Sequence, residues 1–256
     1  MDLDQDGALL DPDDNPGRQI ILPGDVMPGQ IYILPQTQRP FFPGQAVPLL
    51  MDAETWMPTL KAIQARKHDV VGLIATRSEV TGLPGPTDMY DMGTVCRIHR
   101  IHKEGSQIQI LLEGLQRFRV SRWLHDKPPL AIDAEYFPER PQAQSEDSMA
   151  YAVAIINTIK ELIPLNPLYG EELKVFLARS NPNEAAVLAD FAASLTSASK
   201  ADLQEVLETV PLQRRLEKVV ELLHRELEIA KAQMEIRAHV EEEIQGHQRE
   251  AFLRQQ

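Results

Sequence analysis

Cys96, His99 and His102 lie close together in the sequence and carry side chains that can bind a metal ion. Thiolate and imidazole groups are zinc ligands, so this group is the first candidate for a metal centre. The surrounding residues predict a β-strand, on which Cys96 and His102 share one face and His99 points to the other. The three side chains then cannot converge on one ion. We expect ordinary sheet residues and no metal site.

The motifs of nucleotide-binding and hydrolytic enzymes are missing from the chain. It contains no Gly-Lys-Ser/Thr, no Gly-x-Ser-x-Gly, no His-Glu-x-x-His and no Gly-x-Gly-x-x-Gly. His224, His239 and His247 lie among Glu and Arg residues, which indicates solvated helix faces. We therefore expect no catalytic residues in this chain and a function in binding.

Two apolar features are candidates for binding. In Arg39-Pro-Phe-Phe-Pro-Gly44, two adjacent aromatic residues stand between prolines and cannot both point inward from a regular strand. Either both pack inside a loop, or one stays exposed as a contact site. In Gln107–Leu112, alternation places Leu111 on the face opposite the core. The predicted contact site consists of Phe41, Phe42, Pro48, Tyr90 and Leu111, provided that the fold brings them together.

The composition is that of a globular protein. The chain has 256 residues, of which 43% are hydrophobic and 25% are charged, and its single cysteine excludes an intrachain disulfide. No apolar run approaches the roughly 20 residues of a membrane span, and the N-terminus lacks the pattern of a signal peptide. We expect a cytoplasmic protein without a membrane partner.

The net charge of −12 is unevenly distributed. Residues 1–17 carry six Asp and no Lys or Arg, residues 18–142 are nearly neutral, and the remainder is acidic. No basic patch is large enough to neutralise many phosphates, so nucleic acid is an unlikely partner. Residues 1–18, rich in Asp, Pro and Gly, predict a disordered acidic tail.

Residues 19–140 predict a β-rich domain. Short segments rich in β-branched and aromatic residues alternate with Pro and Gly turn signals, and one amphipathic helix follows Asp52 as a plausible N-cap. Short strands with one helix favour a partly closed barrel. The predicted strands are Gln30–Leu34, Val70–Ala75, Gly93–Arg100, Gln107–Glu113 and Phe118–Leu124.

Residues 145–256 predict a helical domain, separated from the β-rich domain by the Pro- and Gln-rich stretch 138–145. Helices are expected over 148–163, 170–179, 183–195 and 199–210, and one long helix from about Pro211 to the end. Its apolar stripe, Leu216, Val219, Leu223 and Leu227, is a candidate seam for self-association. The alternative is that this stripe packs on its own bundle.

Four segments, in order, resemble the N-terminal region of Lon ATP-dependent proteases. The resemblance covers about residues 30–256. The segments are Leu34-Pro with Arg39-Pro-Phe-Phe-Pro-Gly-Gln-Ala-Val-Pro-Leu; Asp88-Met-Tyr-Asp-Met-Gly-Thr-Val-Cys-Arg-Ile; Glu113-Gly-Leu-Gln-Arg-Phe118; and Gln248-Arg-Glu-Ala-Phe-Leu-Arg-Gln255.

The resemblance implies an α+β fold, with a PUA-like pseudo-barrel followed by a helical bundle that ends in a long helix. It implies a non-catalytic fragment that recognises and tethers unfolded or damaged proteins and supports assembly with other Lon subunits, in a parent that is a homohexamer. The ATP and Mg²⁺ sites and the Ser-Lys dyad of that parent would lie beyond this chain, which needs no cofactor. The alternative is a free-standing binding or scaffold protein that self-associates through its long helix.

Overall fold

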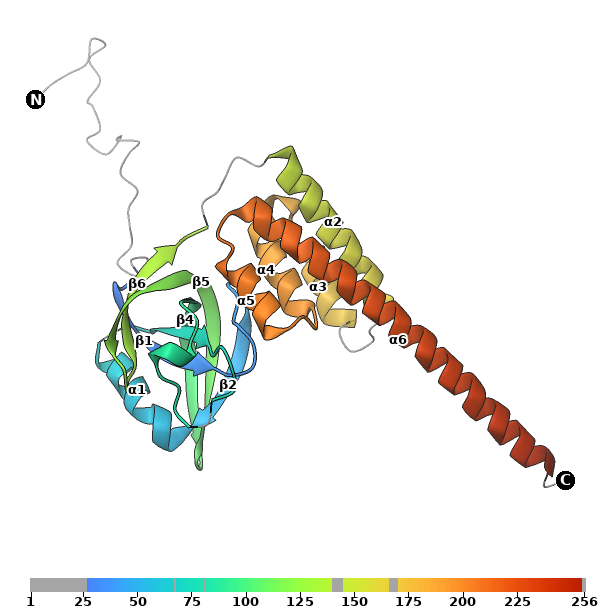
Figure 1. Cartoon of the computed structure of the whole chain (residues 1–256), viewed down its shortest axis with the longest axis horizontal. Helices are drawn as coiled ribbons and strands as arrows, with labels where there is room; N and C mark the ends of the chain where they lie inside the picture. Colours follow the sequence, from blue (N-terminus) through green and yellow to red (C-terminus); the bar gives the residue numbers. More distant parts are fainter. Residues whose placement is uncertain (1–26, 67, 81, 140–144, 166–169, 255–256) are drawn as a thin grey trace, which may run out of the picture.

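The computed structural model describes residues 27–254, apart from residues 67, 81, 140–144 and 166–169. The predicted acidic tail, residues 1–18, and most of the predicted boundary, residues 138–145, lie outside the described residues. Figure 1 shows the β-strands on one side, a group of helices beside them, and one long helix that projects away from both.

Six strands form one mixed sheet. Their order is β2-β5-β4-β3-β1-β6, and β5 also pairs with β6, so five of the strands close into a barrel. β1 and β3 are parallel, and the other pairs are antiparallel. This closure confirms the expected barrel. The strands are β1 Gln30–Gln36, β2 Ala46–Asp52, β3 Val70–Ala75, β4 Met92–Glu104, β5 Gln107–His125 and β6 Ala131–Phe137.

β2 stands outside the closed barrel. It pairs with residues 107–113 of β5, and β6 pairs with residues 117–125 farther along the same strand. β2 and β6 therefore share one edge of β5, while β4 occupies the other. The sequence predicted neither β2 nor β6, and it predicted β5 as two separate strands.

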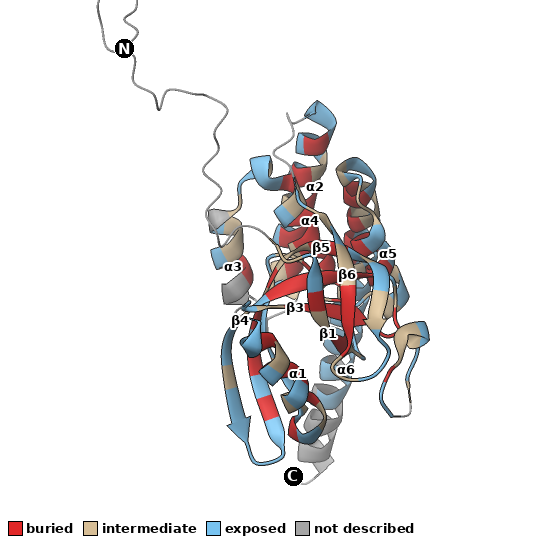
Figure 2. Cartoon of the chain, turned by 90° about the vertical axis from the view of Figure 1, so that its left-hand side faces the viewer, coloured by how far each residue is buried: buried red, intermediate tan, exposed pale blue. Residues whose placement is uncertain are grey.

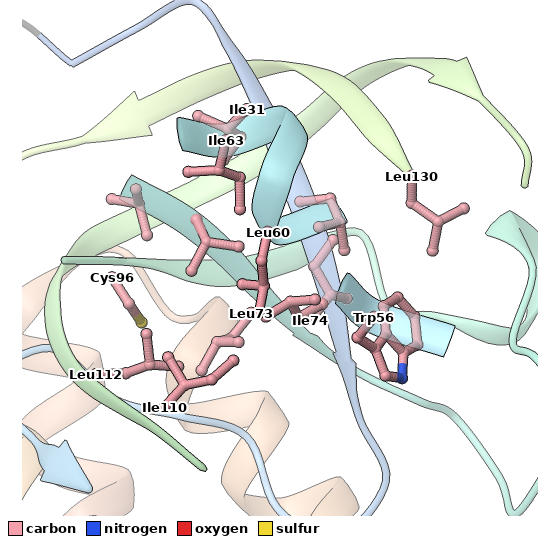
Figure 3. Close-up of a cluster of buried hydrophobic side chains, with 14 of the residues drawn as sticks. Ile31, Trp56, Leu60, Ile63, Leu73, Ile74, Cys96, Ile110, Leu112 and Leu130 are labelled. Carbon is pink, nitrogen blue, oxygen red and sulfur yellow. The ribbon is translucent and has the colours of Figure 1, made fainter. Parts of the chain in front are cut away.

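Helix α1, Ala53–Ala65, begins where predicted. The side chain of Asp52 accepts a hydrogen bond of 2.7 Å from the backbone N–H of Thr55, which is N-cap geometry. Trp56, Leu60 and Ile63 lie one helical turn apart and are buried against the barrel core (Figure 3). This stripe holds α1 against the barrel.

The helical part contains five α-helices among the described residues. α2, α4 and α6 pack against one another around an apolar core, and α5 also contacts β4. α6 begins one residue after the predicted Pro211. These elements confirm the α+β fold class. The helices are α2 Glu146–Leu162, α3 Gly170–Arg179, α4 Ala185–Leu195, α5 Lys200–Glu208 and α6 Leu212–Arg254.

The segment Glu146–Leu165, which includes α2, meets the length and hydropathy criteria of a membrane-crossing helix. No membrane-spanning segment was predicted from the sequence, because that prediction was based only on the length of uncharged apolar runs. In the structure, Ala152, Ile155, Ile159 and Leu162 on this helix are buried in the helical core. Its apolar side is therefore used for packing against α4 and α6.

Candidate protein-binding surface

The exposed face of β2 and β5 brings together two of the predicted contact residues. Pro48 on β2 and Leu111 on β5 are direct cross-strand partners. Leu50, which faces the same way two residues farther along β2, is 62% exposed, and Leu111 is 39% exposed. We call the surface formed by Pro48, Leu50 and Leu111 the outer face.

The opposite side of β5 forms part of the barrel core. Ile108, Ile110 and Leu112 are fully buried, which confirms the alternation predicted for this strand. The β4–β5 hairpin at the lower left of Figure 2 shows this alternation of buried and exposed residues. The β5 part of the outer face is consequently a rigid sheet surface, because its backbone is held by a packed layer behind it.

Charged side chains lie beside the outer face on β4. Arg100 is the cross-strand partner of Leu111. His99 Nε2 lies 2.7 Å from Glu113 Oε2, and Arg97 Nη1 lies 3.9 Å from the same oxygen. These polar groups border the outer face on one side only, because β2 is the last strand on the other side.

The candidate metal ligands do not converge. Cys96 is buried in the barrel core, and burial raises the pKa of its thiol well above the usual value. His99 pairs with Glu113, and His102 is exposed opposite Gln109. Within the described residues, no three Cys, His, Asp or Glu side chains are placed to hold a metal ion.

Phe42, predicted as an exposed contact, is instead 1% exposed, so this part of the prediction is wrong. Its ring belongs to the helical core, whereas Phe41 is half-buried against the barrel core. The Phe41 carbonyl accepts a hydrogen bond from the Thr94 hydroxyl, and the Phe42 N–H donates to Gln45 Oε1 at 2.7 Å. The two adjacent rings thus enter two different cores.

Tyr90 is also separate from the outer face. It precedes β4, whereas Leu111 pairs with Arg100, ten residues farther along. At about 3.3 Å per residue, this spacing corresponds to roughly 30 Å of strand. Tyr90 is half-buried, and the guanidinium carbon of Arg77 lies 4.9 Å from its ring centroid. Tyr90 is therefore not part of the outer face.

The predicted self-association stripe is buried within the chain itself. Leu216, Val219 and Leu223 are fully buried, and Leu227 is 6% exposed, all in the helical core with α2 and α4. They are not available to a second chain, so their assignment to oligomer contacts is wrong and the alternative, packing on the bundle, is confirmed. This outcome follows from the position of the stripe in the first half of α6.

A buried ionic cluster joins the barrel to the bundle, and sequence reasoning missed it. Arg117 on β5 is 1% exposed and forms a two-pronged contact with Asp190 on α4, which is 2% exposed. Its Nε also donates to the Leu207 carbonyl at 3.0 Å. Fully buried Arg215 contacts Glu139 and lies 3.8 Å from Asp190. Burial lowers the pKa of Arg215, although the neighbouring carboxylates oppose that shift.

Three further polar contacts cross the same junction. Gln204 Nε2 donates to the Met92 carbonyl at 2.9 Å, Lys200 Nζ to the Thr37 carbonyl at 2.6 Å, and Arg39 Nη2 to the Thr196 carbonyl at 2.7 Å. Each bond links one strand or loop of the barrel to α5 or to the turn before it. The barrel and the bundle are therefore held in one fixed arrangement.

In comparisons with known proteins, one family match covers the barrel and most of the bundle. Residues 30–225 match the family model described as "ATP-dependent protease La (LON) substrate-binding domain". Lon protease 2 of Hydrogenovibrio crunogenus is 40% identical over 238 residues, which cover 93% of this chain and 27% of that protein. Lon protease of Magnetococcus marinus is 38% identical over 257 residues, covering 99% of this chain and 31% of the relative.

Two solved structures share the fold at low sequence identity. The N-terminal domain of Lon protease from Mycobacterium avium complex superposes with a TM-score of 0.58 at 18% identity, covering 76% of this chain and 98% of that chain. The Lon N-terminal domain protein from Xanthomonas campestris gives a TM-score of 0.54 at 17% identity, with 75% and 97% covered. The present chain thus spans less than a third of the length of the curated relatives it matches, and nearly all of these solved domains.

Proposed function

This chain belongs to the family of LON substrate-binding domains, and we propose that it captures unfolded or damaged proteins on the outer face, Pro48, Leu50 and Leu111. The observation that carries the proposal is the apolar, exposed surface at the open edge of the sheet. Folded proteins bury their apolar segments, whereas unfolded ones expose them. The outer face therefore selects its ligands by their state of folding.

The chemistry of this surface favours weak capture. Full burial of one leucine side chain contributes about 1.5–3 kcal/mol, and the outer face offers two leucines and a proline. Association and ordering of a flexible segment oppose this gain. A captured substrate would be released readily and passed on, which suits a recognition step that precedes chemistry elsewhere.

We also propose that the parent is a Lon-type ATP-dependent serine protease acting in the cytoplasm. The curated relatives named above are Lon proteases more than three times as long as the stretch they share with this chain. This chain has no nucleotide-binding or hydrolase motif of its own. ATP, Mg²⁺ and the Ser-Lys pair would belong to the rest of the parent.

The test of the outer face is the double variant Leu50→Ser with Leu111→Ser. Its affinity for a reduced, carboxymethylated model protein is expected to fall by roughly tenfold or more, because each leucine contributes on the order of 1 kcal/mol to a partly exposed contact. Fluorescence anisotropy of the labelled model protein measures this change. Leu83→Ser with Val175→Ser removes two equally exposed apolar side chains elsewhere and should leave the affinity within about twofold. Equal affinity of the two double variants would exclude the outer face.

A second role, assembly with other Lon subunits, is favoured by a different stripe on α6. Ile229, Ile236, Val240 and Ile244 are between 40% and 63% exposed and recur at helical spacing. At 3.6 residues per turn they lie roughly 110° around the helix from the stripe buried in the bundle. We propose that this projecting stripe, and not Leu216–Leu227, contacts the long helix of another subunit.

Sedimentation velocity across a range of concentrations tests this second role. If the stripe mediates association, Ile236→Ser with Val240→Ser should shift the protein towards monomer and leave its helix content unchanged, because both side chains are exposed in the single chain. Val175→Ser with Val187→Ser, two exposed valines of the bundle, serves as the control. A wild-type protein that is monomeric at every concentration would contradict the assembly role for this chain.

A further inference from the structure

The backbone of β2 has one unused edge. The Gly114 N–H donates to the Gln45 carbonyl, and the Ala53 N–H donates to the Ser106 carbonyl, both at 2.8 Å. These bonds lie at the two ends of an unbroken register between β2 and β5. In an antiparallel pair, hydrogen-bonded and non-bonded positions alternate. The odd-numbered residues of β2 therefore bond to β5, and the even-numbered residues direct their N–H and C=O groups away from it.

Ala46, Pro48 and Leu50 are these outward-directed residues, and all three are exposed. In the part of the chain that the structure describes, no backbone hydrogen bond joins their outward groups to another segment. Exposed edge strands are usually protected by charged residues, bulges or a covering element. Ala46–Met51 contains no charged residue, and the charged residue that ends the strand, Asp52, caps α1, so Pro48 is the one protective feature in the body of this edge.

The apolar layer behind β2 is also incomplete. Val47 on the inner side of β2 is 43% exposed, whereas its cross-strand partner Leu112 is fully buried. Leu49 and Met51 on the same side are only partly buried, although Ile110 and Ile108 opposite them are fully buried. The cover of the barrel core therefore ends at β2, where one further strand would extend it.

We propose that an extended segment of an unfolded polypeptide binds by adding to β2 as a further strand of the sheet. This inference rests on the proposed function and specifies how the substrate is held and which substrates are preferred. Backbone hydrogen bonds supply part of the affinity, and side chains alternate between the two faces. One set lies beside Pro48 and Leu50 on the outer face, and the other lies beside Val47 and Leu49 on the inner face. The preferred segment is consequently apolar on both faces and prone to form strands.

Pro48 favours an unfolded segment over a second copy of this chain. In the register with the greatest overlap, two antiparallel β2 edges place Pro48 opposite Leu50 at two positions, and each of these pairs forms only one of its two hydrogen bonds because proline has no N–H. An unfolded segment meets Pro48 only once and can still donate its own N–H to the Pro48 carbonyl, so it lacks one hydrogen bond where self-pairing lacks two. The edge thus discriminates against self-pairing and remains open to substrate.

Backbone-methylated peptides test the strand addition directly. The probe is a fluorescent ten-residue peptide of Val, Ile and Tyr with Lys at both ends. N-methylation of alternate residues blocks one edge of the peptide and leaves the other free, so affinity should stay within about threefold. N-methylation of six successive residues blocks both edges with the same side chains, and affinity should fall at least about tenfold.

Equal binding of the two methylated peptides would overturn strand addition and leave the outer face as a side-chain contact site. Failure of both the unmodified peptide and the carboxymethylated model protein to bind would overturn the proposed function as well.

The protein side of the same test uses Leu50→Pro and Leu50→Ala. Both variants lose the leucine side chain, but only the proline variant also loses the outward N–H of residue 50, and proline is tolerated at such edge positions. Leu50→Pro is expected to bind the unmodified peptide at least about fivefold more weakly than Leu50→Ala. Circular dichroism checks that both remain folded. Equal affinities of the two folded variants would contradict strand addition, while a similar loss in both relative to wild type would still support the side-chain site.

Discussion

Replacing Phe42 with alanine is expected to lower the free energy of unfolding by about 3–5 kcal/mol, because a fully buried aromatic ring leaves a large cavity when it is truncated. Phe42 is 1% exposed and is the one residue of the 39–44 loop in the helical core. Urea unfolding followed by circular dichroism measures the change. Phe42→Leu, which keeps most of the apolar volume, should lose clearly less stability.

The same experiment separates two interpretations of this loop. If Phe42 were the exposed contact predicted from its Pro-flanked sequence, its truncation would change the stability by no more than about 0.5 kcal/mol. Leu83→Ala provides the reference for an exposed apolar side chain, since Leu83 is 55% exposed. A loss below about 1 kcal/mol in Phe42→Ala, similar to that of Leu83→Ala, would contradict the buried position.

Replacing Arg117 with methionine is expected to destabilise the protein by about 3–5 kcal/mol, since removal of one partner leaves a buried charge without compensation. Asp190 is 2% exposed and accepts two hydrogen bonds from Arg117. After the substitution, the nearest remaining cation is Arg215, whose Nε lies 3.8 Å away and makes no hydrogen bond. Thermal and urea unfolding measure the loss.

The location of this pair predicts a second, more specific effect. Tryptophan fluorescence reports on the β half, because both tryptophans, Trp56 and Trp123, lie there. The circular dichroism signal at 222 nm is dominated by the helices and reports on the bundle. In the wild type the two signals should change together, because the junction couples barrel and bundle. In Arg117→Met the two transitions should separate.

A double-substitution cycle provides the control for this effect. Arg117→Met with Asp190→Leu replaces both charges by apolar groups and should be less destabilised than the sum of the single variants. Additive losses would show that the pair is not coupled. Coincident transitions in every variant would show that the ionic cluster does not join the two halves.

The elements that the sequence predicted correctly are those with a local signal. Val70–Ala75 is rich in β-branched residues, and its predicted bounds match β3. The stripe Trp56, Leu60 and Ile63 predicted α1, and Asp52 fixed its start. The long helix followed from uninterrupted helical spacing after Pro211.

The missed elements depend on neighbours that are distant in the sequence. β2 contains Pro48 and follows Pro43-Gly44, which are turn signals, yet it forms a strand because β5 pairs along its whole length. Proline is compatible with β2 only because the backbone nitrogen of residue 48 is directed away from β5, so that no hydrogen bond to β5 is lost. An uncharged run of six residues, Ala46–Met51, was the available signal for a strand here.

The candidate site was predictable in part for the same reason. The alternation of β5 identified Leu111 as exposed, but its neighbours depended on the unpredicted strand β2, which brought Pro48 and Leu50 beside it. Phe41 and Tyr90 share its apolar character and lie elsewhere. Arg117, the centre of the junction, carries no local signal, because a buried arginine is defined by partners 73 and 90 residues away.

The insertion of two adjacent rings, Phe41 and Phe42, into separate cores has a mechanical consequence. Barrel and bundle cannot rotate against each other unless one ring is withdrawn from its core, so the pair acts as a torsional lock. α6 has 43 residues and extends about 65 Å at 1.5 Å per residue, which makes it a stiff lever anchored in the bundle. The lock lies four residues before β2. A force applied at the C-terminal end of α6 would therefore be transmitted to a polypeptide held at β2 with little relative movement between the bundle and the barrel.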